Sequence, residues 1–146
     1  MKTTCIQLFA RVSIATAFLS AVADRLGYWG DPGQQNVTWG NWENFVSYSN
    51  TLNFFVPNYI GSLLAIAATF LEALLGILLL VGYKTRLSAI LSGTLLTLFA
   101  LSMTLSLGIK STFDYSVWIG ASSCFLLAAI GVYPCSLDNY FFKKIK

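Results

Sequence analysis

The stretch that decides the fold is residues 61–82, GSLLAIAATFLEALLGILLLVG, whose only charged residue is Glu72. As an α-helix it would be roughly 33 Å long, enough to cross a hydrocarbon core about 30 Å thick. Three further apolar stretches of similar length occupy residues 6–27, 87–107 and 115–133. Backbone polar groups in lipid must be hydrogen-bonded internally, and continuous apolar stretches satisfy this as helices rather than as barrel strands. The sequence therefore predicts an all-α membrane protein, a four-transmembrane-helix bundle.

The composition agrees with a single transmembrane domain over residues 1–146. Hydrophobic residues make up 56% of the chain and charged residues 10%, with a mean hydropathy of +0.68. Soluble domains carry about 25% charged residues, so an ordinary water-soluble fold is excluded. The net charge of +3 provides no basic face for nucleic acid. The chain has no histidine and three scattered cysteines, so we expect neither a metal site nor a thiol redox motif.

The distribution of positive residues predicts the orientation of the helices. Most of them flank one side of a four-span topology, and only Arg25 and Lys110 lie on the other side. The positive-inside rule then places both termini in the cytoplasm. The residues on the cytoplasmic side are Lys2, Lys84, Arg86, Lys143, Lys144 and Lys146.

The first apolar stretch also resembles a cleaved signal peptide. Ala21-Val22-Ala23 precedes Asp24 in the manner of a small-residue cleavage site. Arg11 interrupts the apolar run, however, which favours a retained transmembrane helix. We therefore expect the segment to stay in the protein.

The outer loop, residues 28–60, is long and unusually aromatic. Asn41 can cap a short helix that has Glu43 in its first turn. One interpretation is a cover across the outer end of the bundle. The alternative is anchoring of the aromatic side chains in the lipid headgroups. One side of the short helix would be lined by Trp42, Phe45, Val46 and Leu52.

Glu72 is expected near the middle of the bilayer, where a carboxyl group is costly and usually faces the interior of a bundle. Small residues at helical spacing share its side of the helix, which favours close packing against another helix. A ligand or proton site is one interpretation of Glu72, and a charge that only fixes the register of the bundle is the other. The small residues are Gly61, Ala65, Ala68 and Gly76.

Two arginines of the first helix could pair with Glu72. Arg11 is nearer in depth, with an axial offset of roughly 8 Å against about 13 Å for Arg25. Side chains lean toward the N-terminus of their own helix, however, and this direction favours Arg25. The sequence leaves both partners open.

The third and fourth apolar stretches carry stripes of small and hydroxyl residues, which are typical of packing surfaces. Cys124 is accordingly expected to be a small buried residue. Asp114, at the start of the fourth stretch, could cap that helix or form part of a polar mouth beneath the aromatic loop.

Four segments together resemble the DoxX family of bacterial inner-membrane proteins: residues 18–30, 72–87, 108–110 and 114–117. The resemblance implies a four-helix bundle in the cytoplasmic membrane, with Asp24, Arg25, Glu72 and Asp114 as its polar positions. The family is named by similarity to the DoxD subunit of a thiosulfate:quinone oxidoreductase, and its relatives are linked to redox, sulfur or quinone processes. A quinone is therefore the candidate ligand that the resemblance implies.

Three functions are compatible with these residues. The first is a subunit that binds a quinone or a similar apolar ligand, with Glu72 exchanging a proton at a ligand carbonyl and Arg25 or Arg11 setting its charge. The second is a carrier for a small substrate. Four short helices leave little room for a transport pathway, so this function would require a homodimer. The third is a noncatalytic subunit that anchors another protein, such as a redox partner. The candidate site residues are Glu72, Arg25, Asp24, Arg11 and Asp114.

Overall fold

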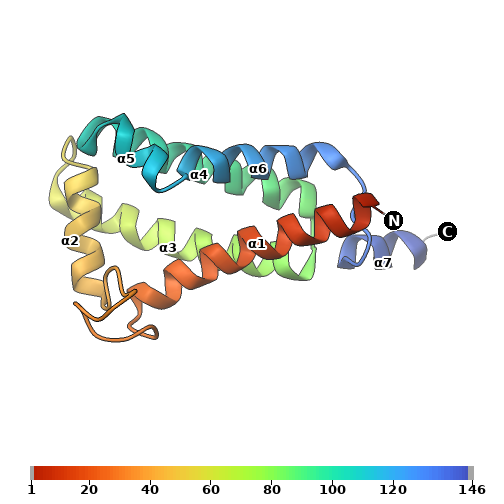
Figure 1. Ribbon diagram of the computed structural model, residues 1–146, viewed down its shortest axis with the longest axis horizontal. Coiled ribbons are helices and arrows are strands. Elements are labelled where there is room, and N and C mark those ends of the chain that lie inside the picture. Colours follow the sequence, from red (N-terminus) through yellow and green to blue (C-terminus); the bar gives the residue numbers. More distant parts are fainter. Residues whose placement is uncertain (1, 145–146) are drawn as a thin grey trace.

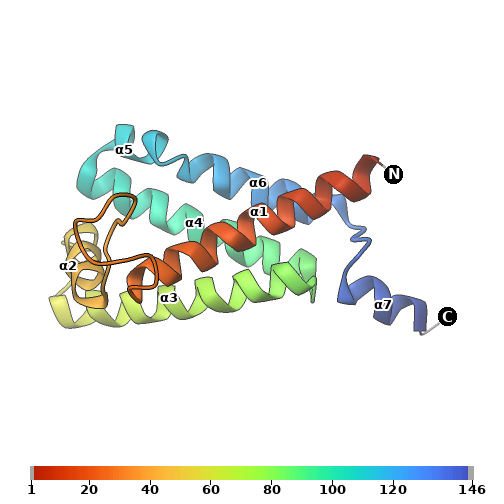
Figure 2. The same ribbon diagram turned by 60° about the horizontal axis from the view of Figure 1, so that its bottom comes forward.

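The computed structural model of the protein describes residues 2–144, which form helices and connecting segments without a strand. Four helices run side by side, α2 crosses one end of them, and α7 extends from the opposite end (Figures 1 and 2). The all-α prediction is confirmed, while Lys146 lies outside the described residues. The helices are α1 (Lys2–Arg25), α2 (Trp42–Leu52), α3 (Asn58–Val81), α4 (Thr85–Leu107), α5 (Ile109–Asp114), α6 (Val117–Ile130) and α7 (Leu137–Lys144).

Three of these helices, α1, α3 and α4, are long and apolar enough to cross a membrane. They begin a few residues earlier than the apolar stretches suggested, since helical hydrogen bonding continues into polar flanking residues. Large apolar side chains on their outer faces stay exposed, as expected of surfaces that lipid covers. Examples are Phe9, Phe70 and Leu105.

The predicted fourth helix over residues 115–133 is wrong in its bounds. The helical path breaks at Ser116, whose φ is 55°, and α6 ends at Ile130, before Gly131 with a φ of 73°. The 14 residues of α6 are therefore preceded by the separate short helix α5. At 1.5 Å per residue, α6 is only about 21 Å long. The indole of Trp118 donates to the Thr112 hydroxyl at 2.9 Å and connects the two pieces.

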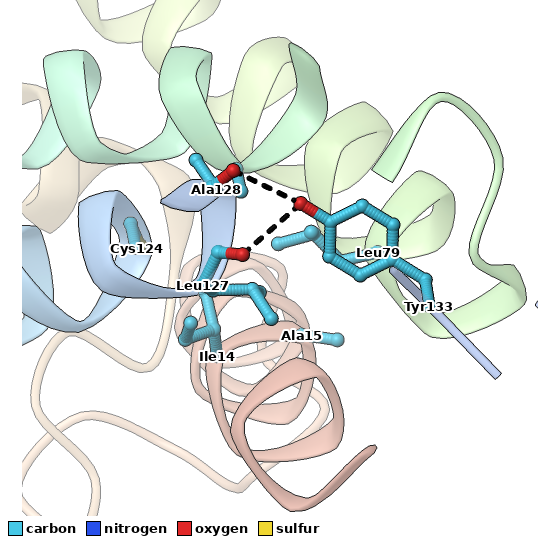
Figure 3. Close-up of a cluster of buried hydrophobic side chains, with 8 residues drawn as sticks. Ile14, Ala15, Leu79, Cys124, Leu127, Ala128 and Tyr133 are labelled. Carbon is cyan, nitrogen blue, oxygen red and sulfur yellow. Dashed lines mark hydrogen bonds between the residues drawn. The ribbon is translucent and has the colours of Figure 1, made fainter. Parts of the chain in front are cut away.

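The core lies where α1, α3, α4 and α6 meet (Figure 3). The Tyr133 hydroxyl reaches back to the end of α6 and donates to the carbonyl oxygens of Leu127 and Ala128 at 3.0 and 3.2 Å. Cys124 is fully buried, as predicted. The buried cluster consists of Ile14, Ala15, Leu79, Ala89, Cys124, Leu127, Ala128 and Tyr133.

The hairpin of α3 and α4 is closed by a glycine and a carboxylate. Gly82 ends α3 in the left-handed conformation, with a φ of 71°. The Asp138 carboxylate then accepts from the backbone N–H groups of Lys84 and Thr85, both at 2.7 Å, at the start of α4. The turn between the two helices is thereby fastened to the segment that follows α6.

The outer loop contains the predicted short helix. The Asn41 side chain caps α2 by accepting from the Asn44 N–H at 2.8 Å, and Phe45 is buried against the bundle. α2 packs on α3 and α4 at the end of the bundle (Figure 1). Other aromatic side chains, such as Tyr28 and Trp29, remain exposed. The structure therefore shows the loop as a cover, with Phe45 of α2 packed against the end of the bundle.

Candidate buried ion-pair site

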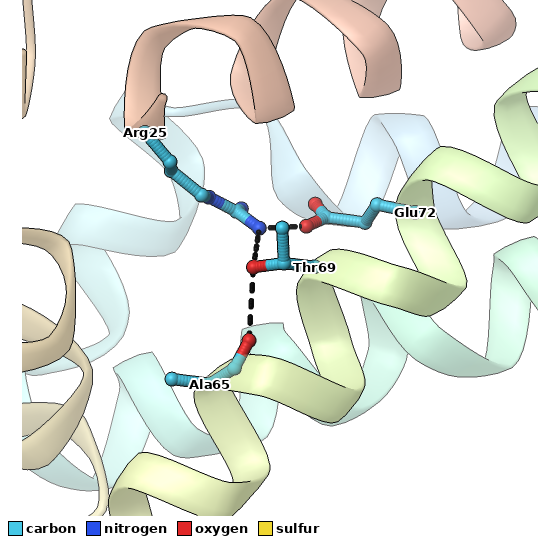
Figure 4. A network of polar contacts seen from close by, with 4 residues as sticks. All are labelled: Arg25, Ala65, Thr69 and Glu72. Carbon is cyan, nitrogen blue, oxygen red and sulfur yellow. Dashed lines mark hydrogen bonds and ion pairs between the residues drawn. The ribbon is translucent and has the colours of Figure 1, made fainter. Parts of the chain in front are cut away.

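The structure pairs Glu72 with Arg25 (Figure 4). Arg25 is the last residue of α1, Glu72 lies inside α3, and both side chains are 4% exposed. The same guanidinium nitrogen, Nη1, also donates to the Thr69 hydroxyl at 2.9 Å. Thr69 in turn donates to the Ala65 carbonyl at 2.9 Å. The side-chain direction in the helices, rather than the difference in depth, decides the partner of Glu72.

Aromatic rings enclose the guanidinium of Arg25. Its Cζ lies 3.9 Å from the centre of the Phe45 ring and 5.2 Å from that of Trp39. The two rings meet edge to face, with their centres 5.1 Å apart. Cation–π attraction is stronger where the cation is desolvated. The charge is therefore stabilised by Glu72 in the bundle and by ring faces from the outer cover.

Asp24 holds this cover in place. Its buried carboxylate accepts from the backbone N–H groups of Thr38, Trp39 and Gly40 at 3.0, 3.1 and 3.4 Å. Gly40 has a φ of 69°, and a Cβ there would lie 2.6 Å from the backbone nitrogen of Pro32. Asp24 thus positions the segment that carries Trp39, whereas the neighbouring Arg25 enters the bundle.

Replacing Asp24 by alanine should free the cover and lower the free energy of unfolding by about 2 kcal/mol, because three backbone donors lose a charged acceptor. Hydrogen exchange at the amides of residues 38–40 measures the effect directly, and we expect it to become faster. Asp31→Ala, an exposed acid in the same loop, is the matched control and should leave the rates unchanged. Equal protection of these amides in Asp24→Ala and the wild type would contradict this role.

Arg11, the alternative partner that the sequence left open for Glu72, lies at the other end of the bundle and does not pair with it. It is 1% exposed and donates to the carbonyl oxygens of Leu79 at 3.0 Å, Leu80 at 3.1 Å and Cys135 at 3.2 Å. The last carbonyls of a helix lack partners within the helix, and they attract cations. Arg11 therefore ties the end of α3 to the chain after α6.

Asp114 is also separate from the buried pair. Its carboxylate binds Lys110 at 2.6 Å within α5, and the side chains are 58% and 85% exposed, respectively. The predicted cap on the fourth helix is wrong, because Ser116 is the residue at the start of α6 and no side chain caps that helix. The close i,i+4 spacing lets Asp114 pair locally instead. Of the five candidate residues, the structure brings Asp24, Arg25 and Glu72 together.

Sequence reasoning missed the contribution of Thr69 and the pairing of Arg25 with ring faces. Thr69 lies three residues before Glu72 on the same helix, a spacing that could have identified it. The sequence identified Trp39 and Phe45 only as aromatic residues of the outer loop and gave no sign of their contact with Arg25. The Arg25 Nε is buried and has no hydrogen-bond partner among the described residues. The site therefore retains one buried donor that no described residue satisfies.

Comparison with known proteins identifies the family. No curated protein and no solved structure matches the chain. The sequence model of the DoxX family matches residues 6–105, which include Asp24, Arg25 and Glu72 and extend from α1 into α4. Together with the three long apolar helices, the match shows a multi-pass membrane protein. The chain belongs to the DoxX family.

Proposed function

We propose that the protein crosses the cytoplasmic membrane four times, with both termini in the cytoplasm and α2 on the outer side. The fourth crossing would be made by α6, since an apolar helix shorter than the hydrocarbon core can be accommodated by local thinning of the bilayer. Lys84 and Arg86 at the turn between α3 and α4 support this orientation.

We infer that the Arg25–Glu72 site binds an apolar, planar ligand that carries a carbonyl oxygen, and a quinone is our candidate. The unpartnered Nε–H of Arg25 carries this proposal. Leaving such a donor buried costs about 1–3 kcal/mol, and a ligand carbonyl would remove that cost. Phe45 and Trp39, whose rings lie against the Arg25 guanidinium, are the aromatic neighbours that a planar ligand bound there would meet.

The ion pair also favours an uncharged ligand. The charges of Arg25 and Glu72 balance each other, so a charged ligand would bring an unbalanced charge into a buried site. Glu72 would accept a proton from a ligand hydroxyl, for example that of a quinol, while Arg25 holds the oxygen. Electron transfer would then require a redox partner protein, so the proposed role is that of a quinone-binding subunit.

Binding of a short-chain ubiquinone to the purified protein tests the proposal. Quenching of tryptophan fluorescence reports occupancy, because Trp39 lies beside Arg25. Arg25→Lys keeps the positive charge and lacks the Nε donor, and Glu72→Gln removes the proton acceptor. Each should weaken binding about tenfold, equivalent to one lost hydrogen bond.

Glu43→Gln, an exposed carboxyl group on α2, is the control and should bind as the wild type does. All variants are compared at matched helix content and thermal stability. Unchanged binding in both site variants would overturn the proposal. Absence of ubiquinone binding to the wild type would do so as well, and would leave the pair with the structural role of fastening the cover to the bundle.

A further inference from the structure

A second site is suggested by a groove of about 740 Å³ at the end of the bundle opposite α2. It lies between the start of α4 and the segment that follows α6. This end contains no part of the Arg25–Glu72 site. The groove is lined by Lys84, Arg86, Leu87, Ile90, Val132 and Asp138, among others.

Two cations line the groove at the start of α4. Lys84 and Arg86 are both exposed, and neither forms an ion pair with any side chain that the structure describes. The carboxylate of Asp138 is engaged by the N–H groups of Lys84 and Thr85 at 2.7 Å, where it caps α4. Two cations therefore face the groove against one carboxylate that is already hydrogen-bonded to backbone.

The apolar lining of the groove comes from α4, beside the cations, and from the segment after α6. Leu87 and Ile90 lie one turn apart on α4 and are 50% and 38% exposed, and Val132 is 66% exposed. The cations lie at the helix end, and the apolar side chains extend from them along α4 toward the middle of the bilayer. A phospholipid at the membrane interface has the matching arrangement, with its phosphate at the surface and its acyl chains directed toward the middle of the bilayer.

We propose that this groove binds an anionic phospholipid of the surrounding bilayer. The lipid phosphate lies between Lys84 and Arg86, and the upper part of an acyl chain covers Leu87, Ile90 and Val132. Each lysine or arginine near anionic lipid contributes favourable binding energy. A zwitterionic lipid carries its own cation, which the two side chains repel. The bound lipid would fasten the turn between α3 and α4.

Native mass spectrometry of the protein with phosphatidylglycerol or phosphatidylcholine of identical acyl chains tests this assignment. We expect phosphatidylglycerol to be retained about tenfold more tightly by the wild type. The combined variant Lys84→Ala, Arg86→Ala should lose this preference, and each single variant should lose part of it. Lys110→Ala removes a charge at the other end of the bundle and should keep the preference.

Two results would overturn the proposal at once: equal retention of both lipids by the wild type, or an unchanged preference in the combined variant. Inorganic phosphate added at the lipid concentration separates a lipid site from a simple anion site. We expect it not to displace phosphatidylglycerol, because it cannot cover the apolar side chains of the groove. Displacement by phosphate would refute a lipid as the occupant.

Discussion

Arg25→Leu is expected to lower the free energy of unfolding by about 3–5 kcal/mol, because it leaves the Glu72 carboxylate buried without a countercharge. Both side chains are only 4% exposed, so water cannot replace the lost partner. The Thr69 hydroxyl loses its donor in the same change. Unfolding in mixed micelles with increasing dodecyl sulfate, followed by tryptophan fluorescence, measures the loss.

Two further variants separate the lost charge from the lost packing. Arg25→Lys keeps a cation beside Glu72 and should cost clearly less than Arg25→Leu. The combined variant Arg25→Leu, Glu72→Leu removes both charges and should recover much of the stability, since apolar residues can replace a buried pair at little cost. A loss below about 1 kcal/mol in Arg25→Leu, the value typical of exposed pairs, would contradict a buried pair.

Arg11→Met is expected to cost about 3–4 kcal/mol, since three carbonyl oxygens lose their donor. Methionine retains much of the volume of the side chain, so the effect reports the hydrogen bonds rather than a cavity. The contact with the Cys135 carbonyl also ties down the segment after α6. We therefore expect faster hydrogen exchange in residues 135–140, together with the loss of global stability.

Arg11→Lys is the matched control for the charge at this end of the bundle. An ammonium group cannot reproduce the fork of the guanidinium, so this variant should recover only part of the lost stability. Full stability in Arg11→Lys would mean that charge alone, and not the three carbonyl contacts, explains the role of Arg11. Wild-type exchange rates in Arg11→Met would contradict the link to the segment after α6.

The helices could be predicted because lipid imposes a length and an apolar character on each span. The stripe of α3 also placed Glu72 correctly on a buried face, since helical spacing is fixed by local geometry. The break at Ser116 could not be predicted in this way. Tyr115 and Ser116 lie in an apolar run, and only the conformation of the chain between α5 and α6 reveals that the helix stops there.

The members of the site were easier to predict than their contacts. Charge in an apolar helix identified Glu72 and both arginines, but the partner depended on how α1 and α3 pack. Asp24 was named beside Arg25, yet its bonds to residues 38–40 connect segments that no local pattern relates. Asp114 was misassigned because a local partner, Lys110, was available four residues away.

The pairing of Glu72 with Arg25 underlies both the closure of the outer cover and the proposed ligand site. A double-mutant cycle with Arg25→Leu and Glu72→Leu tests it most directly, with a parallel cycle of Arg11→Met and Glu72→Leu for comparison. We predict a coupling energy of about 2–3 kcal/mol between Arg25 and Glu72, and a value within about 0.5 kcal/mol of zero between Arg11 and Glu72. Coupling of Glu72 to Arg11 instead, or to neither arginine, would contradict the structure of this site.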